Sequence, residues 1–491
     1  MQARCDVLFD EGTAAGGAPE PGGDPEVGGA AGASPDGSSE AREASEYDAV
    51  SDEYAGDVTI AVHERVRTVL EVEWTQQLAA ERSWLEFSFE GETLRSRPRV
   101  PELGPQRDVV LGVPAETEVS VRVVSEVGGV VTASSEYRAT TGALPAGLPK
   151  PTLFASDPGR ASPEHFMLGS VEDSRGGKEG GYYFRTFYLY LMDRKGRIVW
   201  YYADPSTSAT SSFQRVARDG EYLWIEKRAY AGGLAESVVK MTLDQRYFEE
   251  IPVPGLSDCI DVTDDGALLY DVDGELFERS ASGTTRSIWS CRARFGRAFR
   301  CYTNTVNWYS GEDTVLMSFP YENTVVEISR QTGALVGQYG SARGSYAFAP
   351  PLEAPPAAWA LSFQHFPNRT PEGTLLVSTH APGCAHEPVP GPYRHGFVEF
   401  DIDRATRTLT ERFRYTKGPE WPSAKGMAIR VSNGNTLVNY GTGGVIREVT
   451  PEGRTVFGVK FDVPEGNDFF NKMVGHNVLL DDLYALNGGP G

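Results

Sequence analysis

The sequence contains no long apolar run, no apolar signal-peptide core and too few basic residues to balance its acids. No stretch of about 18 consecutive apolar residues occurs, which predicts that the chain has no transmembrane segment. Its 491 residues include 46 Lys and Arg against 68 Asp and Glu, a formal net charge of −22. A surface with this charge repels phosphate backbones and anionic lipids, so a nucleic-acid partner is excluded. The high glycine and proline contents, 54 and 32 residues, favour a β-rich chain with many tight turns.

Residues 1–57 form a low-complexity acidic segment. They contain fourteen Asp and Glu against Arg4 and Arg42, a net charge of −12. Small, acidic, Pro and Gly residues cannot bury enough apolar area to offset the entropy that is lost on ordering. We therefore expect residues 1–57 to be a disordered acidic tether.

Cys5 lies near the start of this segment, and no apolar signal core precedes it. A cysteine followed by a tether rich in Gly, Ser and acids resembles the mature start of a bacterial lipoprotein. The resemblance implies export to the periplasm or the cell surface, with a lipid anchor at Cys5. The alternative is a cytoplasmic chain, if no export signal has been removed.

Residues 58–146 alternate apolar and polar side chains with a period of two. Turn residues separate the runs VTIAVHE, TVLEVEW, WLEFSFEG, RDVVLGV, EVSVRVVSEVGG and SSEYRATTG. This pattern predicts an antiparallel β-sandwich. Trp74 on an early strand and the stretch from Val119 to the closing ATTGALP resemble a fibronectin type III module. The resemblance implies a spacer, or a docking surface for a protein partner.

Residues 150–491 contain a repeated unit in which a glycine turn opens an apolar strand. The turns are ARDGEYLWI, TDDGALLYDV, SGEDTVLMSF, PEGTLLVST and SNGNTLVNYG, and their glycines are spaced by 46, 45, 62 and 61 residues. Four strands per unit of this length is the period of propeller blades. An earlier copy, FYLYLMDRKGRIVWYY, brings the number of blades to six. The predicted fold class is therefore all-β, a six-bladed β-propeller preceded by the sandwich and the tether.

The strand before each glycine turn is the innermost strand of its blade, next to the central channel. Polar side chains from five blades are expected to converge at the channel mouth, which is the usual ligand site of a propeller. These residues are Arg215, Asp261, Tyr302, Asn304, Gln364, His365 and Lys425. The alternative is that they only form hydrogen bonds between neighbouring blades.

Several segments of this region resemble the arylsulfotransferase family of six-bladed propellers. They are DRKGRIVWYY, YTNTVNWYSGEDTVLMSFPYENTVVEISRQTGALV, SFQHFPNRTPEGTLLVS and KGMAIRVSNGNTLVNYGTGGVIREVTPEGRTVF, within residues 165–462. The resemblance implies transfer of a sulfuryl group between phenols without a nucleotide donor, so no cofactor is expected. The family carries the group on a histidine.

The resemblance can be carried over residue by residue. His365, in the QHF motif, stands where the family has a histidine, and it is the candidate nucleophile or acid–base group. Arg215 or Lys425 would bind the sulfate, and Tyr302 would contact the phenol. Histidines that the family has elsewhere are replaced here, near Cys259 and at Tyr302.

Three function classes stay open on this basis. The first is an arylsulfotransferase-like enzyme with a rearranged site. The second is a non-catalytic propeller that binds an aromatic or sulfated ligand at the channel mouth. The third is a surface scaffold in which the sandwich and the propeller bind another protein.

The remaining cysteines and histidines give two further expectations. Cys291 and Cys301 flank a short loop, and the number of propeller cysteines is even, so a disulfide between these two is predicted and suits an oxidising compartment. His380, Cys384 and His386 in THAPGCAHEPVPGPYRHG do not have a standard zinc spacing, so no metal site is predicted. His476, in the C-terminal MVGHNVLL, is expected to be structural.

Overall fold

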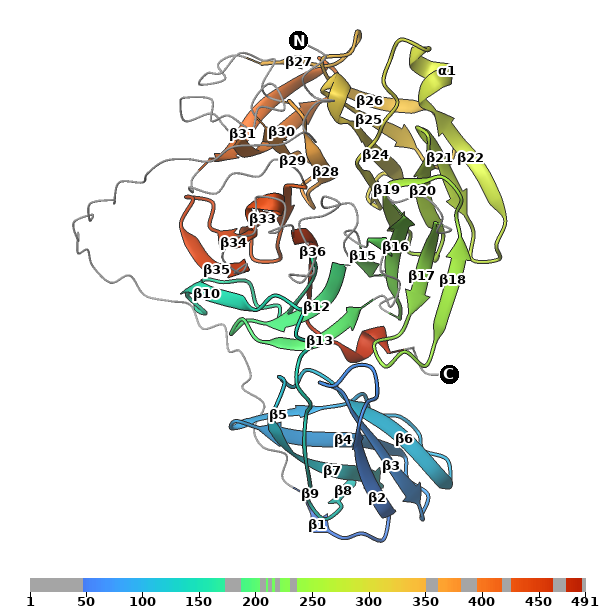
Figure 1. The fold of residues 1–491 in the computed structure, drawn as a ribbon, viewed down its shortest axis with the longest axis vertical. Coiled ribbons are helices and arrows are strands. Elements are labelled where there is room, and N and C mark those ends of the chain that lie inside the picture. Colours follow the sequence, from blue (N-terminus) through green and yellow to red (C-terminus); the bar gives the residue numbers. More distant parts are fainter. Residues whose placement is uncertain are drawn as a thin grey trace, which may run out of the picture.

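The computed structural model describes residues 47–172, 187–203, 209–210, 214–216, 221–229, 236–349, 361–380, 395–416, 425–461 and 474–487. Eight β-sheets carry these residues, two in an N-terminal sandwich and six in a propeller (Figure 1). The predicted all-β class is confirmed. Residues 1–46, which make up most of the predicted tether, lie outside the described residues. No helix in the described part of the chain is long and apolar enough to cross a membrane.

The sandwich packs a three-stranded sheet against a six-stranded sheet. Side chains alternate in burial along its strands, as in β3 (Leu70–Gln76), where Leu70, Val72 and Trp74 point into the core. The smaller sheet has the order β2 (Ala55–Val62), β3 (Leu70–Gln76) and β6 (Gly104–Val110). The larger sheet has the order β1 (Ala49–Val50), β8 (Val130–Ala133), β7 (Glu118–Val127), β4 (Arg82–Phe89) and β5 (Glu92–Arg95), and β9 (Tyr137–Thr140) also pairs with β7.

The ordered sandwich begins before the predicted boundary at Val58. Residues of β1 pair in parallel with β8, and Tyr47 packs on a small apolar cluster that includes Trp84 and Val124. This contact buries apolar surface, which offsets the entropy lost by ordering the last part of the acidic segment. Residues 47–57 are thus part of the sandwich and not of a disordered tether.

The propeller consists of six sheets around one axis, and each inner strand contacts the inner strand of a neighbouring blade. The predicted number of blades is confirmed. From the axis outward, blade one contains β36 (Val474–Leu480), β11 (Phe166–Glu172), β12 (Phe187–Asp193) and β13 (Ile198–Ala203). Blade two contains β15 (Gln214–Val216) and β14 (Ala209–Thr210), then β16 (Leu223–Ala229), β17 (Ser237–Met241) and β18 (Phe248–Pro252). Blade three contains β19 (Leu256–Val262), β20 (Leu268–Val272), β21 (Glu275–Arg279) and β22 (Thr285–Ser290).

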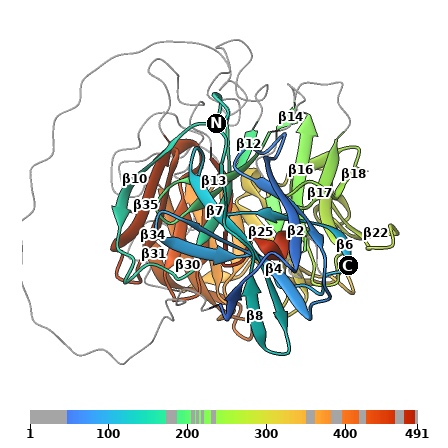
Figure 2. The same cartoon turned by 90° about the horizontal axis from the view of Figure 1, so that it is seen from below.

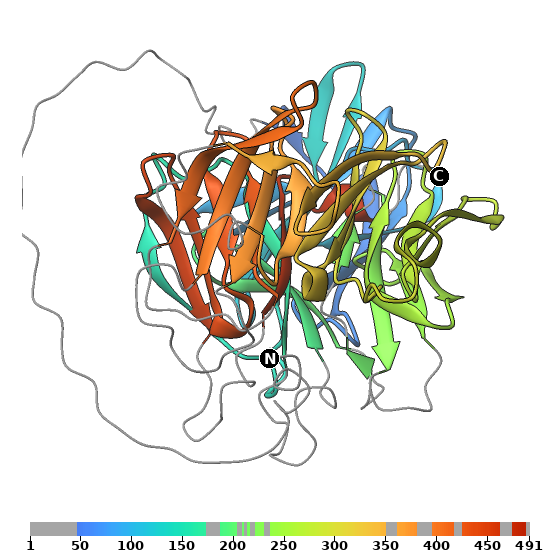
Figure 3. The same cartoon turned by 90° about the horizontal axis from the view of Figure 1, so that it is seen from above.

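The remaining three blades follow in chain order (Figure 3, yellow to red strands). Blade four contains β23 (Val306–Tyr309), β24 (Thr314–Phe319), β25 (Thr324–Ser329) and β26 (Leu335–Gly340). Blade five contains β28 (His365–Arg369), β29 (Leu375–His380), β30 (His395–Asp403) and β31 (Thr408–Tyr415), with β27 (Ala347–Phe348) at its edge. Blade six contains β32 (Met427–Arg430), β33 (Thr436–Asn439), β34 (Val445–Val449) and β35 (Thr455–Phe461), with β10 (Pro151–Ser156) as an outer fifth strand. The short helical elements are α1 (Cys291–Phe295), η3 (Pro320–Glu322), η5 (Gly441–Gly443) and η7 (Tyr484–Leu486).

The two ends of the propeller region close the ring. The C-terminal strand β36 pairs with β11 as the innermost strand of blade one. The N-terminal strand β10 pairs with β35 as the outermost strand of blade six. Blades one and six are therefore each made from both ends of the chain, which holds the ring closed between them.

Buried carboxylates on the third strands join neighbouring blades. Glu448 of blade six is fully buried and bonds to Arg194 of blade one. Glu327 of blade four is also fully buried, and its Oε1 lies 3.3 Å from Nη2 of Arg404 in blade five. Glu399 of blade five pairs in the same way with Arg430 of blade six. Paired and hydrogen-bonded charges are the form in which buried carboxylates are tolerated.

The sandwich packs directly on blades one and two (Figure 2). The hydroxyl of Tyr484, in η7, donates to the Val109 carbonyl at 2.9 Å and accepts from the Leu111 amide at 3.1 Å. Nε2 of His63 lies 3.2 Å from the Asp244 carbonyl oxygen. One continuous apolar cluster runs from the sandwich core into the propeller, so the two units are joined by a packed interface.

Candidate functional site at the channel mouth

Several of the sequence-predicted site residues lie at or just before the start of an inner strand, whereas Asp261 lies near the end of its strand. His365 is the first residue of β28, Asn304 precedes β23, and Lys425 precedes β32. Arg215 lies on β15 and Asp261 on β19. Because inner strands of a propeller run side by side along the axis, their starting ends meet at one mouth of the channel.

Arg215 and Asp261 are in direct contact inside the channel. Nε of Arg215 lies 3.2 Å from Oδ1 of Asp261, and the guanidinium also donates to Oδ1 of Asn307. The Asp261 carboxylate accepts the Trp308 amide at 2.6 Å. The Arg215 side chain is only 10% exposed. Arg215 therefore ties blades two, three and four together, which is the structural role that the sequence left open for it.

A second histidine lies in the channel, and the sequence had predicted only a structural role for it. His476 is on β36, is fully buried, and packs edge to face on Phe366 with 4.0 Å between ring centroids. Burial lowers the pKa of His476 well below its usual value, and the positive charge of Arg215 and Lys425 and the nearby His365 lower it further. The ring is therefore neutral at physiological pH. The signal that could have found it is the missing fourth strand of the first blade, which only the C-terminal segment can supply.

The orientation of His365 is set by Asn304. The Asn304 side-chain amide donates to the Gln364 carbonyl at 3.0 Å and to Nδ1 of His365 at 3.1 Å. Because Nδ1 accepts this bond, the neutral imidazole carries its proton on Nε2. His365 then presents an N–H donor, whereas a nucleophile would need a lone pair at that nitrogen.

Gln364 and Lys425 differ in what they contact. The Gln364 side chain donates to the Ser318 hydroxyl at 3.1 Å and to the Thr324 carbonyl at 3.0 Å, and it is fully buried between blades four and five. Lys425 is a buried residue, and its Nζ lies 5.6 Å from the centroid of the Phe187 ring. Gln364 thus serves the packing of the blades, and Lys425 adds a buried positive charge to the channel.

Unusual backbone conformations gather at this mouth. Cys259, Phe366 and Lys425 have φ values of 109°, 49° and 63°, in a region that bulky side chains rarely adopt. Cys259 also lies where the pairing of β19 with β20 shifts register, and Phe366 lies where the pairing of β28 with β29 shifts register. Bulges of this kind redirect side chains beside active sites, and backbone strain is concentrated at functional sites.

Three aromatic side chains form a row at the mouth, and only Tyr302 was predicted to belong to the site. The Tyr302 and Tyr321 rings are 5.5 Å apart, and the Tyr321 and Phe363 rings are 5.9 Å apart. The Arg300 guanidinium lies 3.9 Å from the Tyr321 ring centroid. Tyr302 and Tyr321 are 43% and 37% exposed, so their rings are accessible from solvent. We call these four residues the aromatic row.

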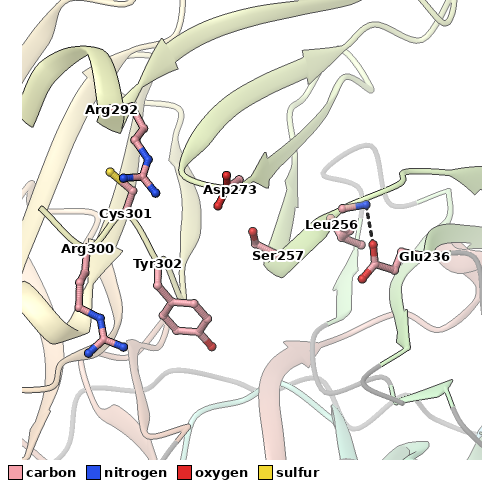
Figure 4. A pocket seen from close by; sticks show the side chains of 9 residues that line it. Glu236, Leu256, Ser257, Asp273, Arg292, Arg300, Cys301 and Tyr302 are labelled. Atoms are coloured by element: carbon pink, nitrogen blue, oxygen red, sulfur yellow. Dashed lines mark hydrogen bonds between the residues drawn. The ribbon is translucent and has the colours of Figure 1, made fainter. Parts of the chain in front are cut away.

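A cavity of about 470 Å³ adjoins the aromatic row (Figure 4). Tyr302 and Arg300 line it together with Arg292. A disulfide joins Cys291 to Cys301, with 5.8 Å between their Cα atoms, and it is the pairing predicted from the sequence. Arg292 follows one half-cystine and Arg300 precedes the other. The disulfide therefore fixes the segments that carry both arginines.

The described residues contain no group of three or more His, Cys, Asp or Glu that could hold a metal ion. Residues 381–394, with Cys384 and His386, lie outside the described residues. Burial raises the pKa of the Cys259 thiol to about 12, so this thiol stays protonated and is no nucleophile.

No family model matches the chain, and no curated protein matches its sequence. Similar solved structures include a 6-phosphogluconolactonase-like protein from Bacteroides fragilis NCTC 9343, at 13% identity and a TM-score of 0.38, which covers 66% of this chain and 100% of that one. A streptogramin B lyase is 14% identical with a TM-score of 0.33, covering 64% of this chain and 98% of that one. A regucalcin from Agrobacterium tumefaciens is 11% identical with a TM-score of 0.32, covering 52% and 74%. The likeness concerns the fold alone, and the number of blades comes from the strand order given above.

Proposed function

We propose that the channel mouth binds an aromatic anion, with aryl sulfate esters as the favoured class. The observation that carries the proposal is the aromatic row, in which the Arg300 guanidinium lies 3.9 Å from the Tyr321 ring beside two further rings. Aromatic rings pack on a phenyl group, and a guanidinium matches the oxygens of a sulfate. In a chain with a net charge of −22, the Arg300 guanidinium beside these rings is a positive group that an anion can bind.

His365 contributes a hydrogen-bond donor to this site. Its Nε2 proton can bind an oxygen of the sulfate, because Asn304 occupies Nδ1. The ester oxygens of an aryl sulfate are acceptors only, so a donor is the group that they require. This assigns His365 a binding role in the resting state, in place of the nucleophilic role that the family resemblance implied.

The second candidate function is sulfuryl transfer of the arylsulfotransferase type. The observation that favours it is the group of His476, Arg215, Lys425 and His365, which lie close enough for their charges to lower the pKa of His476. A neutral imidazole has the lone pair that a sulfuryl carrier needs. His476 is fully buried behind Phe366, so transfer would require Phe366 to move.

The experiment is a titration of the full chain with 4-nitrophenyl sulfate and, separately, with 4-nitrophenol, followed by incubation of the ester with a phenol acceptor. Saturable binding of the ester, stronger than that of the free phenol, supports the first proposal. Release of 4-nitrophenol that depends on the acceptor supports transfer. Equal affinity for the two compounds, or none for either, contradicts the first proposal.

We also propose that the chain is exported and anchored at Cys5, and that its sandwich is a fibronectin type III-like module that can dock a protein partner. The Cys291–Cys301 disulfide supports an oxidising compartment. Mass spectrometry of the N-terminal peptide from cells tests the anchor. A diacylglyceryl adduct on Cys5 is expected, and an unmodified Cys5 contradicts the proposal.

A further inference from the structure

The cavity beside the aromatic row carries both signs of charge. Arg292 and Arg300 line one side, next to the ring of Tyr302. Glu236 lines the opposite side, and Asp273 and Ser257 lie between (Figure 4). The structure therefore brings blades two and three and the loop before blade four to one cavity.

The charges of this cavity are not neutralised by one another. Within the described residues, no ion pair joins Arg292 or Arg300 to Glu236 or Asp273. Oε2 of Glu236 accepts the Gly255 amide at 2.5 Å, which fixes the carboxylate at its side of the cavity. Arg300 is held at the other side by its ring contact with Tyr321 and by its amide, which donates to Glu322 at 2.9 Å.

A ligand with one charge would satisfy only one side of the cavity. An anion would be attracted by the two guanidinium groups but repelled by Glu236 and Asp273. A cation would be attracted by the two carboxylates but repelled by the guanidinium groups. A molecule with separated positive and negative groups complements both sides at once. The volume of about 470 Å³ lies within the range of small-molecule sites.

We propose that this cavity is a binding site for an aromatic zwitterion of the amino-acid type. Its carboxylate lies toward Arg292 and Arg300, its ammonium group toward Glu236 and Asp273, and its ring toward Tyr302. The proposal goes beyond aryl sulfate binding, because it assigns a second ligand class, which needs no sulfate, to a cavity that shares Arg300 and Tyr302 with the aromatic row.

The test uses three probes with the same phenol ring. Calorimetric titration of the full chain compares L-tyrosine with tyramine, which lacks the carboxylate, and with 3-(4-hydroxyphenyl)propanoate, which lacks the ammonium group. We expect tyrosine to bind about fivefold more tightly than either analogue, which corresponds to one exposed ion pair of about 1 kcal/mol. Equal affinity for the three probes, or no binding of tyrosine, would overturn the proposal.

Two variants locate the charges. Glu236→Gln should remove the preference for tyrosine over the propanoate and keep its preference over tyramine. Arg292→Gln should remove the preference for tyrosine over tyramine and keep its preference over the propanoate. Arg297→Gln, an exposed change in the same loop as Arg292, is the matched control and should alter neither preference. A loss of both preferences in the control would contradict the assignment of these residues.

The outcome is distinguishable from that of the aryl sulfate proposal. Binding of 4-nitrophenyl sulfate without binding of tyrosine would reject the zwitterion site and leave aryl sulfate binding intact. Tyrosine binding without ester binding would support the zwitterion site and reject aryl sulfate binding. Thermal denaturation of each variant shows whether a loss of binding reflects a loss of fold.

Discussion

The side-chain amide of Asn304 donates a hydrogen bond to Nδ1 of His365 across 3.1 Å. This contact joins blade four to blade five, and it fixes the proton of the neutral His365 ring on Nε2. The histidine that the QHF motif singles out is thereby presented as a hydrogen-bond donor. The role of His365 depends on a residue 61 positions away in the sequence.

Replacing Asn304 should weaken binding of the ester without affecting the free phenol. In Asn304→Leu the ring is free to carry its proton on either nitrogen, so the donor toward the sulfate is lost for part of the population. We expect the dissociation constant of 4-nitrophenyl sulfate to rise by about twofold, because the affinity falls in proportion to the fraction of molecules that carry the proton on Nε2. Nitrogen NMR of His365 should show one tautomer in the wild type and a mixture in the variant. A single unchanged tautomer in Asn304→Leu would contradict this account.

The stability of the protein should fall as the pH drops below about 6.5, the usual pKa of histidine. The pKa of His476 is lowered in the folded state, chiefly by burial, and that of His63 is also lowered by burial. Between the lowered pKa and 6.5 the unfolded chain binds more protons, so the free energy of unfolding rises with pH in this window. Denaturant unfolding at pH 5.5 and 7.5 should show the difference. His476→Leu should reduce it, and an equal pH dependence in this variant would reject His476 as a source.

Removing a buried carboxylate between blades should be strongly destabilising. Glu448 bonds to Arg194, to the Ser162 amide at 2.6 Å and to the Asn435 side chain at 2.7 Å. Glu448→Ala leaves these groups buried without their acceptor, which should cost about 3–5 kcal/mol in the free energy of unfolding. Glu452→Ala changes an exposed residue in the next turn and serves as the control, with little effect. Similar unfolding midpoints for the two variants would show that the pair does not hold the ring closed.

The cysteines should differ in reactivity. The Cys259 thiol, with its pKa raised to about 12 by burial, should resist iodoacetamide in the folded protein and react only after denaturation. Cys291 and Cys301 should react only after reduction, because they form a disulfide. Peptide mapping by mass spectrometry measures both. Alkylation of Cys259 under native conditions would mean that the channel is open at this point.

The repeat of glycine turns was sufficient to predict six blades, because each turn is a local feature followed by its own apolar strand. The inner strand of blade one could not be placed in this way. It comes from the C-terminus and pairs with β11, about 300 residues earlier, so no local pattern marks it. His476 was assigned a structural role for this reason. The start of the sandwich was also misplaced, because composition alone does not reveal that Tyr47 finds a cluster around Trp84 to pack on.

The candidate site was predicted only in part, because local patterns predict where a residue lies on its strand but not which distant residues it contacts. Inner-strand positions identify which residues face the axis, and they led to Arg215, Asp261, Asn304 and His365. They do not show how a side chain is used: Gln364 turns into the blade interface, and Arg215 is held by Asp261. The aromatic row depends on contacts between a loop and two blades, and no spacing in the sequence encodes these contacts.

The most direct measurement is the dissociation constant of 4-nitrophenyl sulfate for the wild type, Tyr321→Ala and Tyr247→Ala. Tyr321 and Tyr247 are both 37% exposed, but Tyr247 lies next to β18 on the outer strands of blade two, away from the mouth. If the aromatic row binds the ester, Tyr321→Ala should weaken binding by about 1–3 kcal/mol, through lost ring packing and the displaced Arg300, while Tyr247→Ala has no effect. Equal dissociation constants for all three proteins, with the fold intact, would contradict the proposed function.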